Sequence, residues 1–135
     1  MRWAYNNAYY PAIPIMPVCF SYQGTSLRLG PFDAIVDTGA DATIIPETIA
    51  LKLQAAPLNV GQLKTQWGDV HPVTLYLLDL EIKEQLLPAI IVAGDAGNDE
   101  IILGRDVLNK LALLLDGPQQ STQMLSDVTL WRLRT

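Results

Sequence analysis

Short apolar runs, separated by Gly, Pro, Asn and Asp, recur along most of this chain. Three of these runs border polar turn residues. Residues 32–36 end at Asp37-Thr38-Gly39, residues 42–45 follow that turn, and residues 101–103 end at Gly104-Arg105-Asp106. Short apolar runs bounded by turn residues are typical of buried β-strands. The pattern predicts a mainly β protein in which two strand ends carry charged side chains.

The other apolar runs predict further strands, at residues 18–22, 27–29, 60–66, 70–78, 77–82, 86–93, 111–115 and 128–133. Gly30-Pro31 is expected to turn the chain between two of them. Residues 46–52 are expected to form a short helical turn, because a proline suits the start of a helix. Residues 1–17 lack a period and contain three prolines. They are expected to form an extended arm on the body or on a partner chain, before a single domain at residues 18–135.

Composition and charge argue against several classes of partner and setting. The chain has 135 residues, 50% of them hydrophobic, with a net charge of −5. An acidic chain is a poor ligand for nucleic acid, which attracts basic surfaces. The longest apolar run, residues 86–93, is too short for a bilayer, so no membrane partner is expected. One cysteine, Cys19, and no signal-peptide pattern favour a reducing, cytoplasmic setting.

Other catalytic chemistries find little support in the sequence. Cys19 and His71 lack the local context of a thiol protease, and a buried structural cysteine is the simpler interpretation. One histidine and one cysteine cannot supply an ordinary zinc site. No glycine-rich phosphate loop is present. No metal and no cofactor is therefore expected.

The two turn segments together resemble the signature segments of retropepsin-like aspartic proteases. Asp37-Thr38-Gly39-Ala40 is similar to the catalytic loop, and residues 101–106 are similar to the second segment near the end of the chain. The resemblance extends over about residues 18–116. It implies a mainly β, single-domain retropepsin-like acid protease fold with one short helix near the C-terminal end. Because the chain contains one Asp-Thr-Gly, it supplies half of a two-carboxylate site, and the resemblance implies a homodimer.

The resemblance also suggests a role for each nearby residue. Asp37 is the expected catalytic residue, Thr38 a contact across the dimer axis, and Gly39 and Ala40 small residues that leave room for substrate. Asp41 is expected to pair with Arg105. Further positions are implied to line substrate pockets or to form the tip of a flap over the cleft: Ile35, Ile44, Ile102, Trp67 and Gly68.

Simpler interpretations of these residues stay open. Asp-Thr-Gly is a common turn tripeptide, the isoleucines could be ordinary core residues, and the hairpin around Trp67 could be a surface hairpin packed on the body. The sequence favours an aspartic endopeptidase that cleaves peptides or unfolded proteins. Two alternatives remain: a catalytically idle peptide-binding or dimerisation module, and a precursor that needs removal of residues 1–17.

Overall fold

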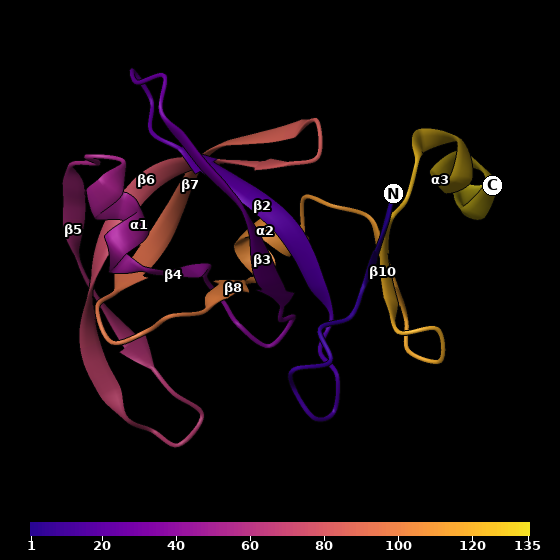
Figure 1. Cartoon of the computed structure of the whole chain (residues 1–135), viewed down its shortest axis with the longest axis horizontal. Coiled ribbons are helices and arrows are strands. Elements are labelled where there is room, and N and C mark those ends of the chain that lie inside the picture. The colour runs from indigo at the N-terminus through magenta and orange to yellow at the C-terminus, as the bar shows by residue number, and fades with distance from the viewer.

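A computed structural model describes all residues, 1–135, and is mainly β (Figure 1). The strands are β1 (Arg2–Ala4), β2 (Ile15–Ser21), β3 (Arg28–Val36), β4 (Ile44–Pro46), β5 (Pro57–Lys64), β6 (Val70–Ile82), β7 (Gln85–Asp95), β8 (Ile101–Leu103), β9 (Leu113–Asp116) and β10 (Ser121–Met124). The helices are α1 (Glu47–Lys52), α2 (Arg105–Leu108) and α3 (Asp127–Arg134). The predicted mainly β class, with a short helix near the C-terminal end, is confirmed.

Seven strands form a sheet that closes on itself. Their order is β2-β3-β8-β4-β7-β6-β5, and β2 also pairs with β6. The closing pairs join Cys19–Ser21 to Asp79–Glu81. Closure leaves β5 as the outer strand beside the barrel and reduces the number of unpaired edges.

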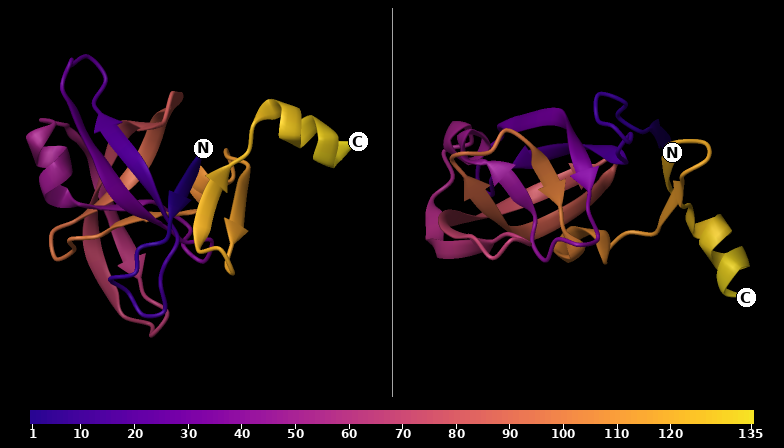
Figure 2. Two further views of the ribbon diagram at one scale, coloured as in Figure 1. Left: turned by 45° about the vertical axis from the view of Figure 1, so that its right-hand side comes forward. Right: turned by 90° about the horizontal axis from the view of Figure 1, so that it is seen from below.

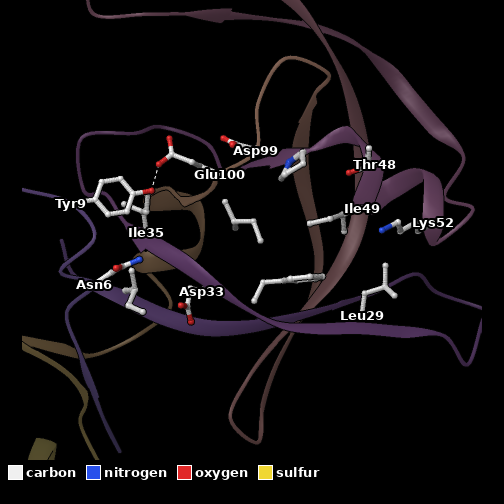
Figure 3. Close-up of a pocket in the computed structure, with 14 residues that line it drawn as sticks. Asn6, Tyr9, Leu29, Asp33, Ile35, Thr48, Ile49, Lys52, Asp99 and Glu100 are labelled. Atoms are coloured by element: carbon white, nitrogen blue, oxygen red, sulfur yellow. Dashed lines mark hydrogen bonds between the residues drawn. The ribbon is translucent and has the colours of Figure 1, made fainter. Parts of the chain in front are cut away.

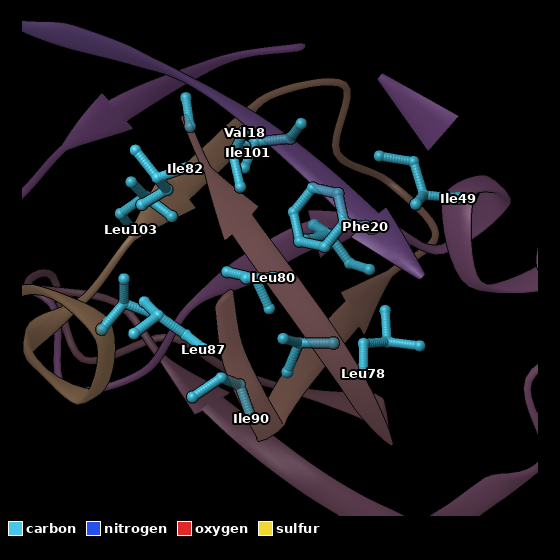
Figure 4. Close-up of a cluster of buried hydrophobic side chains, with 14 of the residues drawn as sticks. Val18, Phe20, Ile49, Leu78, Leu80, Ile82, Leu87, Ile90, Ile101 and Leu103 are labelled. Carbon is cyan, nitrogen blue, oxygen red and sulfur yellow. The ribbon is translucent and has the colours of Figure 1, made fainter. Parts of the chain in front are cut away.

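The barrel interior holds the core (Figure 4). Along β6 the buried side chains alternate with partly exposed ones, which is the period expected of a strand with one face inward. Phe20, Leu78 and Leu80 are almost fully buried in the cluster. Burying each such side chain contributes about 1.5–3 kcal/mol to stability. The core thus supports the strands that carry the two turn segments.

The predicted turn at Gly30-Pro31 is wrong. The two strands expected on either side of it are one strand, β3. A register shift between Val18 and Phe20 of the neighbouring β2 absorbs the irregular residues. Gly30 has a φ of 118°, and a Cβ there would lie 2.8 Å from the carbonyl oxygen of Val18. The glycine therefore permits a close strand approach instead of a turn.

A second, three-stranded sheet, β1-β10-β9, lies beside the barrel and ends in α3. Figure 2 shows α3 projecting away from the barrel beyond this small sheet. The strand predicted at residues 128–133 is wrong, because this segment is part of α3. Ser126 caps the helix by accepting from the N–H of Thr129 at 3.2 Å. Asp127 in the first turn and two arginines in the last turn also favour a helix.

The N-terminal segment packs on its own chain. Arg2–Ala4 forms β1 and pairs with β10, and Asn6 bridges to Ile13 to close a small loop. β2 already begins at Ile15. None of the helices is long and apolar enough to cross a membrane.

Candidate active site

The C-terminal end of β3 delivers Asp37 to a tight turn. β3 runs parallel to β8, and the N–H of Asp37 donates to the carbonyl of Leu103 at 3.1 Å. Asp37 Oδ1 accepts a hydrogen bond from the N–H of Gly39 at 2.9 Å. The backbone carbonyl of Asp37 accepts a second one from the N–H of Ala40 at 3.2 Å. The half-buried carboxylate has no ion-pair partner in the chain. The turn therefore orients one carboxyl oxygen and leaves the other without a protein donor.

A buried hydrogen-bond network ties the loop to α2. Thr43 is fully buried, and its hydroxyl donates to Asp106 Oδ1 at 2.8 Å while its N–H donates to Oδ2 at 3.2 Å. The same hydroxyl accepts from the N–H of Gly104 at 3.2 Å. Sequence reasoning gave neither Thr43 nor Asp106 a role. A threonine inside the apolar run at residues 42–45 was the available signal, since a buried hydroxyl needs partners.

Gly104 lies where the two turn segments cross. A Cβ at this position would be 2.4 Å from the carbonyl oxygen of Ala42 and 2.5 Å from its carbonyl carbon. Those are backbone atoms that cannot move aside without displacing the loop. The glycine is therefore required by close backbone approach and not by its φ angle.

Arg105 contacts the loop from the second segment at three points. Its Nη1 donates to the carbonyl of Thr38 at 2.8 Å, its Nη2 pairs with Asp41, and its N–H donates to the carbonyl of Ala40 at 2.9 Å. The pair expected from the sequence is present. Its side chains are 45% exposed for Arg105 and 89% exposed for Asp41. The pair is therefore a surface contact that orients the loop more than it stabilises the fold.

A cleft of about 290 Å³ separates the loop from β5. Gly39, Ala40, Asp41 and Ile44 line one side of it, and residues 62–64 of β5 line the other. The small residues of the loop bring its backbone to the cleft surface. Backbone groups exposed in this way can pair with an extended peptide, as a sheet edge does.

The β5–β6 hairpin extends past this cleft to a tip at residues 65–69. The N–H of Thr65 donates to the carbonyl of Asp69 at 2.9 Å, and Gly68 has a φ of 87°. Trp67 is 82% exposed, so it does not pack on the body of its own chain. The hairpin contributes residues 62–64 to one wall of the cleft, and its tip presents an exposed aromatic side chain.

The three isoleucines do not share one cavity. Ile102 is paired with Ile35 on one side and with Ile44 on the other, in the sheet. Ile44 lines the cleft beside the loop, whereas Ile35 lines a different cavity, together with Tyr9 (Figure 3). No group of three or more His, Cys, Asp or Glu side chains is placed to hold a metal ion.

Comparison with known proteins identifies the family and the fold. The chain matches the gag-polyprotein putative aspartyl protease family over residues 28–110, more than half of its length. No curated protein sequence matches it. Among solved structures it is similar to a retropepsin-like aspartic protease from Rickettsia conorii, with a TM-score of 0.61 and 16% identity over 92% of this chain and 88% of that chain. It is also similar to EIAV protease complexed with the inhibitor HBY-793, with a TM-score of 0.56 and 19% identity over 73% of this chain and 86% of that chain.

At these identities the solved structures establish the fold, and the family match covers both turn segments. The chain therefore belongs to the retropepsin-like aspartic protease family.

Proposed function

We propose that the protein is a homodimeric aspartic endopeptidase in which Asp37 of two copies forms the catalytic pair. The observation that carries the proposal is the setting of Asp37. One carboxylate lies at the tip of β3, beside a cleft, in a loop that the second segment fixes through Arg105 and Asp106. The chain has no second Asp-Thr-Gly to complete the pair.

The chemistry follows from two carboxylates at close range. At about 3 Å they cannot both ionise, so they share one proton. The ionised Asp37 takes a proton from a bound water, and the oxygen of that water attacks the peptide carbonyl. The protonated Asp37 donates to the carbonyl oxygen, and proton transfer to the departing amine then breaks the C–N bond. No covalent intermediate with the protein forms, and no cofactor takes part.

The second copy has a surface available to it. β9 pairs with β10 on one side only, so its other edge is free. Leu114 and Leu115 on this strand are exposed. An unpaired apolar edge favours pairing with another strand. Thr38, which is exposed, has its hydroxyl free for a contact across the axis.

The cleft favours an extended peptide with apolar side chains. Its loop side offers backbone groups around Gly39 and Ala40, and Ile44 and Leu63 supply apolar surface. A peptide bound between the loop and the hairpin would be covered by residues 65–69. Trp67 would then lose the exposure that it has in the free chain.

A requirement for removal of residues 1–17 is not favoured by the packing. Met16 is fully buried in the core and β1 pairs with β10. Cutting before Val18 would remove both contacts. We therefore propose that the chain is active with its N-terminal segment in place.

Asp37→Asn tests the proposal, with Glu84→Gln as the matched control. The control removes an exposed carboxylate from the β6–β7 turn, where it forms no ion pair. Purified proteins are incubated with an unfolded protein and with a peptide library, and the fragments are identified by mass spectrometry. Loss of cleavage in Asp37→Asn alone supports the proposal. Cleavage at the wild-type rate by Asp37→Asn contradicts it, and no cleavage by the intact protein favours an idle binding module.

A further inference from the structure

A separate cavity of about 380 Å³ lies outside the cleft and shares no lining residue with it. It is bounded by β3, α1, the segment before β8 and the N-terminal loop (Figure 3). Its volume lies within the range of about 300–1,000 Å³ found for ligand pockets. Its floor is apolar, and the residues that form it include Ile15, Leu29, Phe32, Ile35 and Ile49.

The cavity extends along β3 toward Asp37, which directly follows the last residue of that strand. Ile35 lines the cavity and comes two residues before Asp37. Side chains two apart on a strand share a face and are separated by roughly 6.6 Å along it. A polypeptide bound at Asp37 can therefore place a nearby side chain over Ile35.

The rim of the cavity is acidic. Asp33, Asp99 and Glu100 line it, with Lys52 on α1 at the opposite end as the only basic residue (Figure 3). Neither Asp33 nor Asp99 makes a hydrogen bond or an ion pair through its side chain. Glu100 accepts from the hydroxyl of Tyr9, which closes the rim on the side of the N-terminal loop.

The ionisation of Tyr9 reflects this local charge. Its pKa is raised above 10.0, first by the hydrogen bond to Glu100, then by burial, and then by the charges of Glu100 and Asp99. A further negative charge is disfavoured next to these carboxylates, and a positive charge is favoured. The field at the rim therefore selects cationic groups.

An apolar floor beneath an acidic rim matches one kind of side chain. Lysine and arginine carry a long aliphatic stem that packs on apolar surface and a charged end group that stays at its edge. The end group could reach Asp33 or Asp99, whose carboxylates have no other partner. Asp33 and Asp99 are exposed to water, so a purely apolar side chain would pack on the floor but gain nothing from the two carboxylates.

We propose that this cavity is a substrate subsite that binds a lysine or arginine side chain of the cleaved polypeptide, with Asp33 and Asp99 as the residues that recognise its charge. The proposal rests on the proposed protease function for the identity of the ligand. It assigns a charge specificity to a cavity that is separate from the cleft beside Ile44.

Cleavage of matched peptides measures this specificity. A good substrate is varied one position at a time to lysine, norleucine or glutamate; norleucine retains the four-carbon stem of lysine without its charge. At one position we expect kcat/KM for lysine to exceed that for norleucine by about two- to fivefold, as for one solvent-exposed ion pair. Asp33→Asn with Asp99→Asn should bring this ratio close to one, and Asp99→Lys should make glutamate the better residue. Glu84→Gln is the control and should leave the ratio unchanged.

A binding measurement separates this proposal from the proposed function. N-acetyl-lysine amide and N-acetyl-norleucine amide are titrated into the chain while the methyl signals of Ile15, Ile35 and Ile49 are followed by NMR. Larger shifts with the lysine compound, lost in the Asp33→Asn, Asp99→Asn protein, support the subsite even if no peptide is cleaved. Equal shifts with both compounds, or no shift with either, overturn it, as does a cleaving enzyme without preference for lysine or arginine at any position.

Discussion

The guanidinium of Arg105 joins the carbonyl of Thr38 to the carboxylate of Asp41 across more than sixty residues of sequence. No other side chain forms hydrogen bonds to the candidate catalytic loop on both sides of Gly39. Both members of the Arg105–Asp41 ion pair are substantially exposed. The pair can therefore position the loop while contributing little to the free energy of unfolding.

Arg105→Ala should reduce activity much more than stability. An exposed ion pair contributes about 0–1 kcal/mol, so the free energy of unfolding should fall by no more than about 1 kcal/mol. Without the bond to Thr38 the loop loses its fixed position, and kcat/KM should fall at least about tenfold. Urea unfolding and peptide cleavage are measured side by side.

Asp41→Asn is the matched control for this change, because it removes the charge pair and keeps Arg105 bound to Thr38. It should retain most of the activity. Equal losses in both variants would mean that the ion pair, and not the bond to Thr38, positions the loop.

Thr43→Val should destabilise the fold. The change is nearly isosteric, but it leaves Asp106 and the N–H of Gly104 without the hydroxyl that both use. An unsatisfied buried group costs about 1–3 kcal/mol, and the free energy of unfolding should decrease by about that amount. Thr43→Ser keeps the hydroxyl and should lose less. A Thr43→Val protein as stable as the wild type would show that the network contributes nothing net.

Gly104→Ala should destabilise the fold more than the addition of a methyl group at any other glycine of the chain. The added Cβ would meet backbone atoms of Ala42 at 2.4 Å and 2.5 Å, so the crossing segments must separate. We expect a loss of about 3 kcal/mol or more, measured by chemical denaturation. Gly117→Ala is the control, because a Cβ there has no neighbour within 4 Å. Similar stability of the two variants would contradict the close crossing.

Activity should depend on association of two chains. Specific activity should fall as the protein is diluted through the dimer dissociation constant. Excess Asp37→Asn chains should inhibit the wild type by forming mixed dimers, and excess Glu84→Gln chains should not. Sedimentation across the same concentrations measures the dimer directly. Constant activity per wild-type chain throughout would place a complete site within one chain.

Stability should decrease at alkaline pH through Tyr76. Its pKa is raised from 10.0 by burial, and next by the hydrogen bond and charge of Glu47. In the unfolded chain the phenol ionises at its ordinary pKa, whereas the folded chain retains the proton. The resulting stabilisation is complete below pH 10.0 and decreases as the pH rises toward the folded pKa. The stability advantage of wild type over Tyr76→Phe should therefore shrink above pH 10.0, and an advantage that grew would contradict this assignment.

The local parts of the fold could be predicted from the sequence. The strand before Asp37, the turn after it and the second segment at Ile101–Leu103 are each encoded in a few adjacent residues. The pairing of Arg105 with Asp41 was also expected, because the family resemblance connects the two segments. The solvent exposure of the Arg105–Asp41 pair was not expected, since it depends on packing around the loop.

Other parts depend on distant contacts or on weak local signals. Closure of the barrel by β2 and β6 brings together residues that no local pattern links. β10, with the sequence Ser-Thr-Gln-Met, lacks an apolar run and was missed. In α3 the cap at Ser126 outweighs the strand-like residue types. The separation of Ile35 from Ile44 follows from the three-dimensional course of the sheet.

For the proposed homodimer, the bonds from Thr43 to Asp106 and Gly104 have a consequence for the rate and strength of association. They are formed within one chain, so the loop is already shaped before a second chain arrives. Little conformational entropy then remains to be lost at the loop when two copies meet, and the contacts across the axis contribute to affinity almost undiminished. We expect two preformed surfaces to dock, without slow refolding steps in the kinetics of dimer formation.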